Sequence, residues 1–212
     1  MTLRTFFNIA LVLGVLAIAS GCVTRSSPPA QLLVLVPLAS AAQGTAATSI
    51  KPSELGSERV PALVIGPIDL PAYTERAQVL TLHGESELRA AVSARWAEPL
   101  DQNFSRVLVE NLSRLLGTGE VTTLGSVHTP TALQITLEVT EFVATDAGFA
   151  VLTAYWRVLG DGGRKVLVSN KTHYQEPTNG SDFPALVAAM SRALAALSRD
   201  IAQALQHVSE TQ

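Results

Sequence analysis

Leu133-Gln-Ile-Thr-Leu-Glu-Val-Thr140 alternates apolar and polar residues without a break. A period of two predicts a β-strand with one face against a core and the other face in water. After a turn at residues 145–148, the pattern resumes with apolar residues at every second position from Ala150 to Val158. A turn at residues 160–163 leads to a third extended segment, from Lys165 to Tyr174. Three such segments joined by short turns predict an antiparallel meander.

Two segments on either side of this meander have the period of a helix. Between Glu98 and Leu116, apolar residues recur at intervals of three or four, and Gly117 follows as a stop signal. The C-terminal segment has a longer apolar stripe, with Ser181 or Asp182 as a cap and Pro184 in the first turn. Together these elements predict an α+β fold: an antiparallel sheet with two main helices packed on one face, in a single domain.

The first half of the chain holds shorter candidate strands. Gln31 to Leu38 is a β-rich apolar run that we expect to be a strand buried on both faces, and Val60 to Leu70 predicts another. Gln78 to His83 and Glu87 to Ser93 predict a hairpin. Residues 39–58 are small and polar, which is typical of a loop.

The N-terminus has the pattern of a bacterial secretory signal. A basic residue, Arg4, precedes an apolar run from Phe6 to Ile18 and three small residues, Ala-Ser-Gly, at 19–21. The only cysteine of the chain, Cys22, follows directly. This arrangement resembles the lipobox of bacterial lipoproteins, in which the cysteine receives a diacylglycerol on its sulfur and becomes the acylated N-terminus. We expect residues 1–21 to be the signal peptide, 22–30 a flexible tether and 31–210 the domain.

Two other interpretations of the N-terminus remain open. Ala17-Ile18-Ala19 is a site for ordinary signal cleavage, which would leave Cys22 as a free thiol in a secreted protein. An uncleaved membrane anchor is the second, although the apolar run is shorter than the roughly 20 residues that span a bilayer. Lipobox sequences usually carry Leu three residues before the cysteine, where this chain has Ala19.

Composition argues against several classes of function. The chain has 212 residues and a net charge of −3, and loss of Arg4 with the signal leaves 14 basic against 18 acidic residues. A mildly acidic domain is a poor candidate for nucleic-acid binding or for electrostatic adsorption on anionic lipid. With Cys22 acylated, no cysteine remains for a disulfide, so the core alone must hold the fold.

Motifs of catalysis are missing from the sequence. It has no G-x-S-x-G elbow, no phosphate-binding glycine loop and no cysteine–histidine set with the spacing of zinc ligands. Glu138 and Glu141 are three apart on a predicted strand, so we expect them on opposite faces and unable to act as a pair. The four histidines, His83, His128, His173 and His207, are scattered along the chain. Two of them, His83 and His173, fall in predicted strands and suit surface or hydrogen-bonded positions. The sequence therefore favours a protein that is not an enzyme and needs no cofactor or metal.

The segment that leads into the first helix combines an arginine and a tryptophan: Arg95-Trp-Ala-Glu-Pro-Leu100. Pro99 suits a first helical turn, and Glu98 complements the helix N-terminus. Trp96 either packs to fix the entry angle of the helix or forms, with Arg95, a contact for a partner, since these two residue types are common interface anchors.

The connection Gly66-Pro-Ile-Asp-Leu-Pro-Ala-Tyr-Thr-Glu-Arg76 is stiff, because it contains two prolines. Tyr73 and Arg76 lie on it. They are candidates for a second part of a partner contact, and the alternative is a rigid loop with Tyr73 folded over the core.

Two longer strings resemble the ABC-type transport auxiliary lipoprotein family, the family of paraquat-inducible protein C. They are Gly66-Pro-Ile-Asp-Leu-Pro-Ala-Tyr-Thr-Glu-Arg-Ala-Gln-Val79 and Arg95-Trp-Ala-Glu-Pro-Leu-Asp-Gln-Asn-Phe-Ser-Arg-Val-Leu108. The resemblance extends over essentially the whole mature chain. It implies a non-catalytic outer-membrane lipoprotein that works beside an MCE-domain protein and its inner-membrane transporter components. The residue after Cys22 is Val rather than Asp, which implies export to the outer membrane, and a ring-like homo-oligomer would suit such a role.

The expected function is therefore an accessory component of an ABC- or MCE-type system that moves lipids or hydrophobic compounds across the periplasm and helps to maintain membrane integrity. Two alternatives stay open. One is an autonomous lipid-binding carrier, which needs a pocket of about 300–1,000 Å³. The other is a structural lipoprotein that assists outer-membrane assembly.

Overall fold

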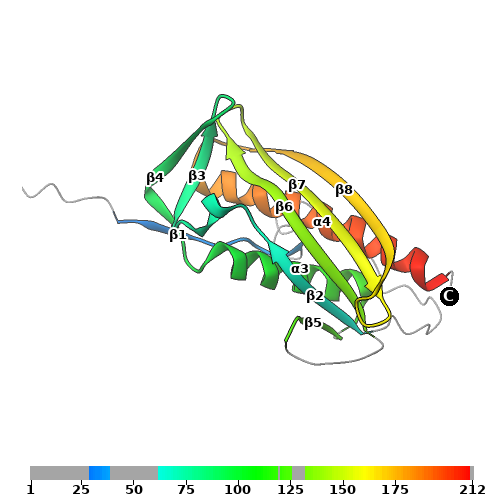
Figure 1. Ribbon diagram of the computed structural model, residues 1–212. Helices are drawn as coiled ribbons and strands as arrows, with labels where there is room; N and C mark the ends of the chain where they lie inside the picture. Colours follow the sequence, from blue (N-terminus) through cyan, green and yellow to red (C-terminus); the bar gives the residue numbers. More distant parts are fainter. Residues whose placement is uncertain (1–28, 39–61, 119, 126–131, 211–212) are drawn as a thin grey trace, which may run out of the picture.

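Eight strands and two long helices make up the part of the chain that the structure describes, residues 29–38, 62–118, 120–125 and 132–210 of a computed structural model (Figure 1). A short 3₁₀ helix, η2, lies between the second and third strands. In chain order the elements are β1 Gln31–Leu33, β2 Leu63–Asp69, η2 Ala72–Glu75, β3 Gln78–His83, β4 Glu87–Trp96, α3 Leu100–Leu116, β5 Val121–Thr123, β6 Leu133–Thr145, β7 Phe149–Gly160, β8 Lys165–Pro177 and α4 Phe183–Glu210.

The meander is present as β6, β7 and β8, which pair antiparallel in this order. Leu137 lies opposite Trp156, and Val158 lies opposite Val168, so apolar positions of neighbouring strands share one face. Both helices cover that face, and α4 lies along the three strands (Figure 1). The prediction of a single α+β domain with two main helices is confirmed.

The rest of the sheet differs from a plain meander because several of its pairs are parallel. Strand β2 pairs parallel with the first half of β6, and β3 pairs parallel with its last two residues. Strand β1 is parallel to β4, and β5 is parallel to β2. The eight-stranded sheet is therefore mixed rather than antiparallel throughout. Alternation shows which face of a strand is buried, but it does not show which neighbours the strand takes.

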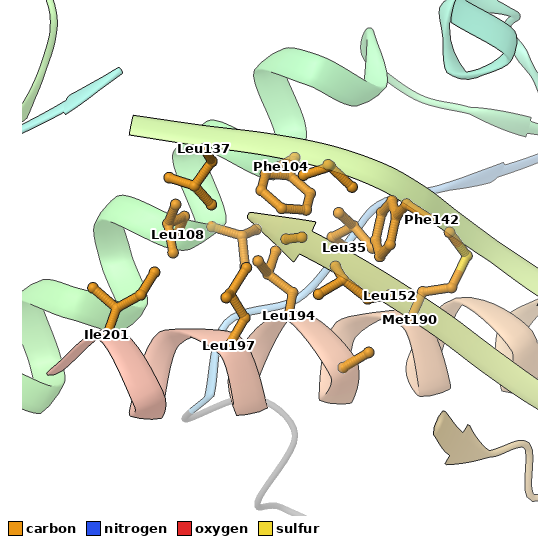
Figure 2. Packing of buried hydrophobic residues seen from close by; sticks show 14 of the residues in the cluster. Leu35, Phe104, Leu108, Leu137, Phe142, Leu152, Met190, Leu194, Leu197 and Ile201 are labelled. Atoms are coloured by element: carbon orange, nitrogen blue, oxygen red, sulfur yellow. The ribbon is translucent and has the colours of Figure 1, made fainter. Parts of the chain in front are cut away.

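The core lies between the inner face of β6 and β7 and the two helices. Phe104 of α3 meets Phe142 of β6 edge to face, with 5.3 Å between the ring centres. Figure 2 shows these two rings together with the aliphatic side chains of α4 beneath them. The side chains labelled there, all buried, are Leu35, Phe104, Leu108, Leu137, Phe142, Leu152, Met190, Leu194, Leu197 and Ile201.

The segment predicted as one strand from Gln31 to Leu38 has two parts. Only Gln31–Leu33 joins the sheet, as β1 at its edge, where Gln31 and Leu32 are exposed. Residues 34–38, which we term the strap, then enter the space between α3 and α4, where Leu35 is buried in the core (Figure 2). The run is apolar because it crosses the core between two helices. The predicted loop that follows, residues 39–58, lies outside the described residues.

The other predicted elements are present with small differences in length. Strand β2 begins three residues later than expected, and β4 continues to Trp96, beyond the predicted end of the hairpin. Helix α3 ends at Gly117, which has φ +63° and donates its N–H to the carbonyl of Ser113. Helix α4 begins after Asp182, whose carboxylate accepts the N–H of Ala185 at 3.0 Å. Strand β5 was not expected, because three residues carry no readable period.

The expectation for Glu138 and Glu141 was wrong. The pairing of β6 with β7 shifts between Val139 and Glu141, so one extra residue, Thr140, forms a bulge. Glu138 lies opposite Tyr155, and Glu141 lies opposite Thr153, two positions away on the same face. The bulge thus places both carboxylates on the outer face of the sheet.

Candidate functional site

Trp96 is the last residue of β4, and its side chain is only 8% exposed. Its N–H donates to the carbonyl of Ala77 at 2.8 Å, and its register partner in β1 is Leu33. The ring therefore belongs to the core, and the backbone of Trp96 joins the edge strand to the hairpin. Arg95, the preceding residue, has its side chain on the outer face and is exposed.

Glu98 follows this tryptophan and organises the start of α3. Its carboxylate accepts hydrogen bonds from Arg106, at 2.7 Å, and from the side-chain amide of Asn103. The Arg106 guanidinium, and after it the Asn103 amide, lower the pKa of Glu98, while partial desolvation opposes them. The carboxylate is therefore ionised at neutral pH and fixes the first two turns of the helix.

Two buried asparagines of α3 hold the strap. The side-chain oxygen of Asn103 accepts the N–H of Leu35 at 2.6 Å, and that of Asn111 accepts the N–H of Leu38 at 2.9 Å. From α4, the hydroxyl of Ser191 accepts the N–H of Val36 at 3.1 Å. These side chains replace the ladder bonds that the strap loses when it leaves the sheet.

Sequence reasoning did not find these asparagines. Both lie on the apolar stripe of α3, eight residues apart, and both are fully buried. A polar amide on the core face of a helix is a signal for a buried hydrogen-bonding partner, because an unpaired amide there would be costly. The partner itself, a backbone segment some 70 residues earlier in the chain, could not be inferred from the spacing.

Tyr73 lies on η2 and is partly buried. Its hydroxyl accepts the N–H of Phe142 at 2.9 Å. Strand β2 pairs with β6 as far as Glu138, and β3 pairs from Ala144, so this edge of β6 is open between them. Tyr73 closes that gap. Burial raises the pKa of Tyr73, and the charge of Glu141 adds a smaller upward shift, against the hydrogen bond from Phe142.

The structure thus divides the four residues of the predicted partner contact into two pairs. Trp96 and Tyr73 have packing and hydrogen-bonding roles inside the fold. Arg95 and Arg76 are exposed, and neither forms an ion pair with another described residue. Arg76 lies two residues before Gln78, which is the register partner of Arg95 in β3. A partner contact at any of these four positions stays a prediction.

Cys22, the predicted lipid-attachment residue, lies outside the described residues, as does His128. The two histidines on described strands, His83 of β3 and His173 of β8, each lie close to a polar side chain. His83 lies 3.3 Å from the carboxylate of Asp146, and His173 Nδ1 lies 2.8 Å from the hydroxyl of Thr153.

A polar row crosses the outer face of the meander at the bulge. The hydroxyl of Thr153 donates to Glu141 at 3.2 Å, and on its other side it contacts His173. Since this hydroxyl has one proton, His173 donates to it from Nδ1. One row further, the ammonium of Lys171 lies 4.9 Å from the ring centre of Tyr155. The row is exposed to solvent and joins three strands by side-chain bonds.

An open groove of about 710 Å³ lies between α3 and the strands β2 and β5. One wall is apolar, with Ile65, Ile68 and Leu124, and the other is polar, with Asp101, Gln102 and Arg106. The interior hollow beside Tyr73 and Trp96 holds only about 10 Å³, which is too small for an acyl chain.

Within the described ranges, no three His, Cys, Asp or Glu side chains are grouped to hold a metal ion. In the same part of the chain, no helix combines the length and apolar character needed to cross a membrane.

The sequence model of one protein family matches residues 42–202, which is more than half of the chain. Its description is the ABC-type transport auxiliary lipoprotein component. The match includes both strings described above, the meander and most of α4. No curated protein matches the chain in sequence.

Solved structures share the fold. A crystal structure of an uncharacterised protein is 21% identical, with a TM-score of 0.61 over 68% of this chain and 91% of that one. Protein XCC0632 from Xanthomonas campestris, of the family DUF330, is 17% identical, with a TM-score of 0.55 over 67% of this chain and 84% of that one. At these identities the likeness concerns the fold.

Proposed function

We propose a function from one premise, which is that the chain belongs to the family of ABC-type transport auxiliary lipoprotein components. On this premise, the protein is a non-catalytic accessory lipoprotein of a system that moves lipids or hydrophobic compounds across the periplasm. The observation that carries the proposal is the family match over residues 42–202, which covers most of the folded domain.

The N-terminal pattern supports an acylated anchor. Cys22 follows a secretory signal directly and is the only cysteine, so its sulfur is the only thiol that can receive the diacylglycerol. Buried CH₂ groups contribute about 0.8 kcal/mol each to membrane binding, so N-acyl and S-diacylglycerol chains together give a stable anchor. With Val at position 23, the proposed location is the outer membrane, with the domain in the periplasm.

The chemistry of the domain supports a role without catalysis. The carboxylates whose pKa values are lowered, Glu87 and Glu98, each owe this first to a hydrogen bond from an arginine of the same local structure. Tyr73 and Tyr174, whose pKa values are raised chiefly by burial, are bonded to Phe142 and Asp200. These perturbed groups have structural partners and do not converge on one cleft.

The proposed partner is an MCE-domain protein with its inner-membrane transporter components, and a homo-oligomer is part of the same proposal. Arg76, exposed on the connection before β3, is the side chain of the predicted contact that is proposed to meet it. Arginine is common among interface anchors because its guanidinium binds carboxylates in two places.

The experiment is a crosslinked pull-down of the tagged full-length protein from envelopes, followed by mass spectrometry. A photoreactive residue at position 76 reports contacts at the proposed surface, and one at Ser169, on the exposed strand β8, serves as the matched control. Crosslinks to an MCE-domain protein from position 76 only are expected. Outer-membrane proteins alone would instead indicate a structural role in assembly.

A second function is favoured by one observation, the groove of about 710 Å³ between α3, β2 and β5. Its volume lies in the range of small-molecule sites. If the protein is an autonomous lipid carrier, phospholipid will copurify with it in the absence of an MCE-domain protein. Replacement of the apolar wall by Ile68→Asp should then release that phospholipid.

A further inference from the structure

We propose that one edge of the sheet is a membrane-contacting surface, formed by exposed side chains of β1, of β4 and of Val34, the first residue of the strap. It consists of Leu32, Val34, Val92 and Arg95, and we term it the edge patch. The proposal rests on acylation of Cys22, which belongs to the proposed function, and it adds a second site of lipid contact in the folded domain.

The edge patch exposes three aliphatic side chains. The exposed fraction is 91% for Val92, 67% for Leu32 and 40% for Val34. The pairing of β4 with β3 is irregular at this point, between Ala90 and Arg95, and Val92 lies in the unpaired stretch. Isolated exposed aliphatic residues need no explanation, but several on adjoining strands indicate a contact surface.

Register places two of these residues side by side. Leu32 of β1 is the Cα partner of Arg95 in β4, so their side chains share the outer face. Their neighbours in sequence, Leu33 and Trp96, pack on the core side. The outer position of Leu32 is therefore fixed by the burial of Leu33, and the leucine cannot turn inward without breaking β1.

The position of the anchor determines which surface meets the membrane. Cys22 precedes Gln31 by nine residues, and at about 3.4 Å per residue the intervening chain reaches at most about 30 Å. Helix α4, with 28 residues, is about 42 Å long. An anchor at Cys22 therefore keeps the start of β1 within about 30 Å of the bilayer, a shorter span than the length of α4. In Figure 1 the chain enters the fold along β1, the edge strand next to β4.

The chemistry of the edge patch fits a lipid surface. Aliphatic side chains suit the boundary between headgroups and acyl chains, and an arginine beside them can bind a phosphate oxygen. The mature domain has a net charge of −4, so attraction by charge alone would be weak. The apolar side chains and the nearby anchor must then provide the contact. A stable protein interface takes roughly 20–30 residues per side, many more than this patch offers.

The test uses the full-length acylated protein in nanodiscs of phosphatidylethanolamine and phosphatidylglycerol. Acylation converts the sulfur of Cys22 to a thioether, so Val92→Cys introduces the only free thiol, and this thiol takes an environment-sensitive dye. Ser169→Cys on β8, at the opposite edge of the sheet, is the matched control. Because both positions are exposed, neither substitution should lower the melting temperature.

Bromine on the acyl chains quenches a dye that lies among them. We expect brominated lipid to cause a loss of emission at position 92 and none at position 169, and Leu32→Cys should behave like position 92. If the dye at position 92 has the same emission in brominated and unbrominated nanodiscs, with one dye per chain, the membrane contact is overturned while the anchor stays intact. Disulfide-linked dimers through position 92 would assign the patch to a second copy and also overturn it. Two dyes per chain would reveal a free Cys22 and overturn the anchor and the contact together.

Discussion

Asn103 is a single buried amide that ties three segments of the chain together. Its oxygen accepts the N–H of Leu35 in the strap, its NH₂ group donates to Glu98, and its own N–H donates to the carbonyl of Pro99. A buried polar group that loses its partner costs about 1–3 kcal/mol, so the residue contributes through the groups it satisfies.

Asn103→Ala should therefore lower the free energy of unfolding by about 1–3 kcal/mol, because it leaves the N–H of Leu35 buried and unpaired. Urea denaturation followed by circular dichroism measures the change. Ser105→Ala, on the same helix but only half-buried, is the control and should stay within about 0.5 kcal/mol of wild type. A similar midpoint for both variants would show that the strap is not held by this amide.

Tyr73 gives a prediction about alkaline pH. Burial raises its pKa, so the unfolded chain loses this phenolic proton first as the pH rises above about 10. The free energy of unfolding should then fall with pH in that range. In Tyr73→Phe the decrease in the free energy of unfolding that is due to this residue should be absent. The titration of tyrosinate absorbance should also lose one group with a raised pKa. An unchanged titration curve would mean that the hydroxyl is not buried against Phe142.

At the scale of elements, the connection from β4 to α3 can be tested by two adjacent residues. Trp96→Ala empties a buried site and should lower the free energy of unfolding by about 3–5 kcal/mol. Arg95→Ala removes an exposed side chain and should change it by about 0.5 kcal/mol or less. Thermal melts of the two variants and the wild type measure the change in stability. If Arg95→Ala lost stability as Trp96→Ala does, Arg95 would have a structural role as well.

The periodic elements could be predicted from the sequence, and the irregular ones could not. The three segments of the meander and the apolar stripes of α3 and α4 predicted three strands and two helices, because burial of one face imposes a period. The bulge at Thr140 does not show in the period of the sequence. It adds one residue to one strand, so every position after it changes face relative to the pattern before it.

The candidate site shows the same division. Trp96 was recognised as a packing residue or a contact, and either interpretation was compatible with its sequence neighbours. What separates it from Arg95 is the pairing of β4 with β1, a parallel contact between segments more than 60 residues apart. Contacts of this range arise from the whole fold and leave no local signal, and the same holds for the bonds from the asparagines to the strap.

At the scale of the whole molecule, the prediction concerns the anchor. Cys22→Ser removes the acceptor sulfur, so the protein should remain an unprocessed precursor that retains residues 1–21 and takes up no radiolabelled palmitate. Intact mass and autoradiography of envelope fractions measure both properties. Palmitate in the variant would contradict acylation at Cys22. A product that begins at Ser20 would instead support ordinary signal cleavage after Ala19.

The route of the strap determines how the domain responds to mechanical force. A pull from the membrane acts at the start of β1, roughly along the strand. It loads the bonds between β1 and β4 and the three side-chain bonds to the strap at the same time, in shear rather than one after another. Leu35, buried among the core residues between the helices, would have to be drawn out through them. With the proposed lipid anchor at one end and the proposed partner at the other, this arrangement would let the domain carry tension without unfolding from β1.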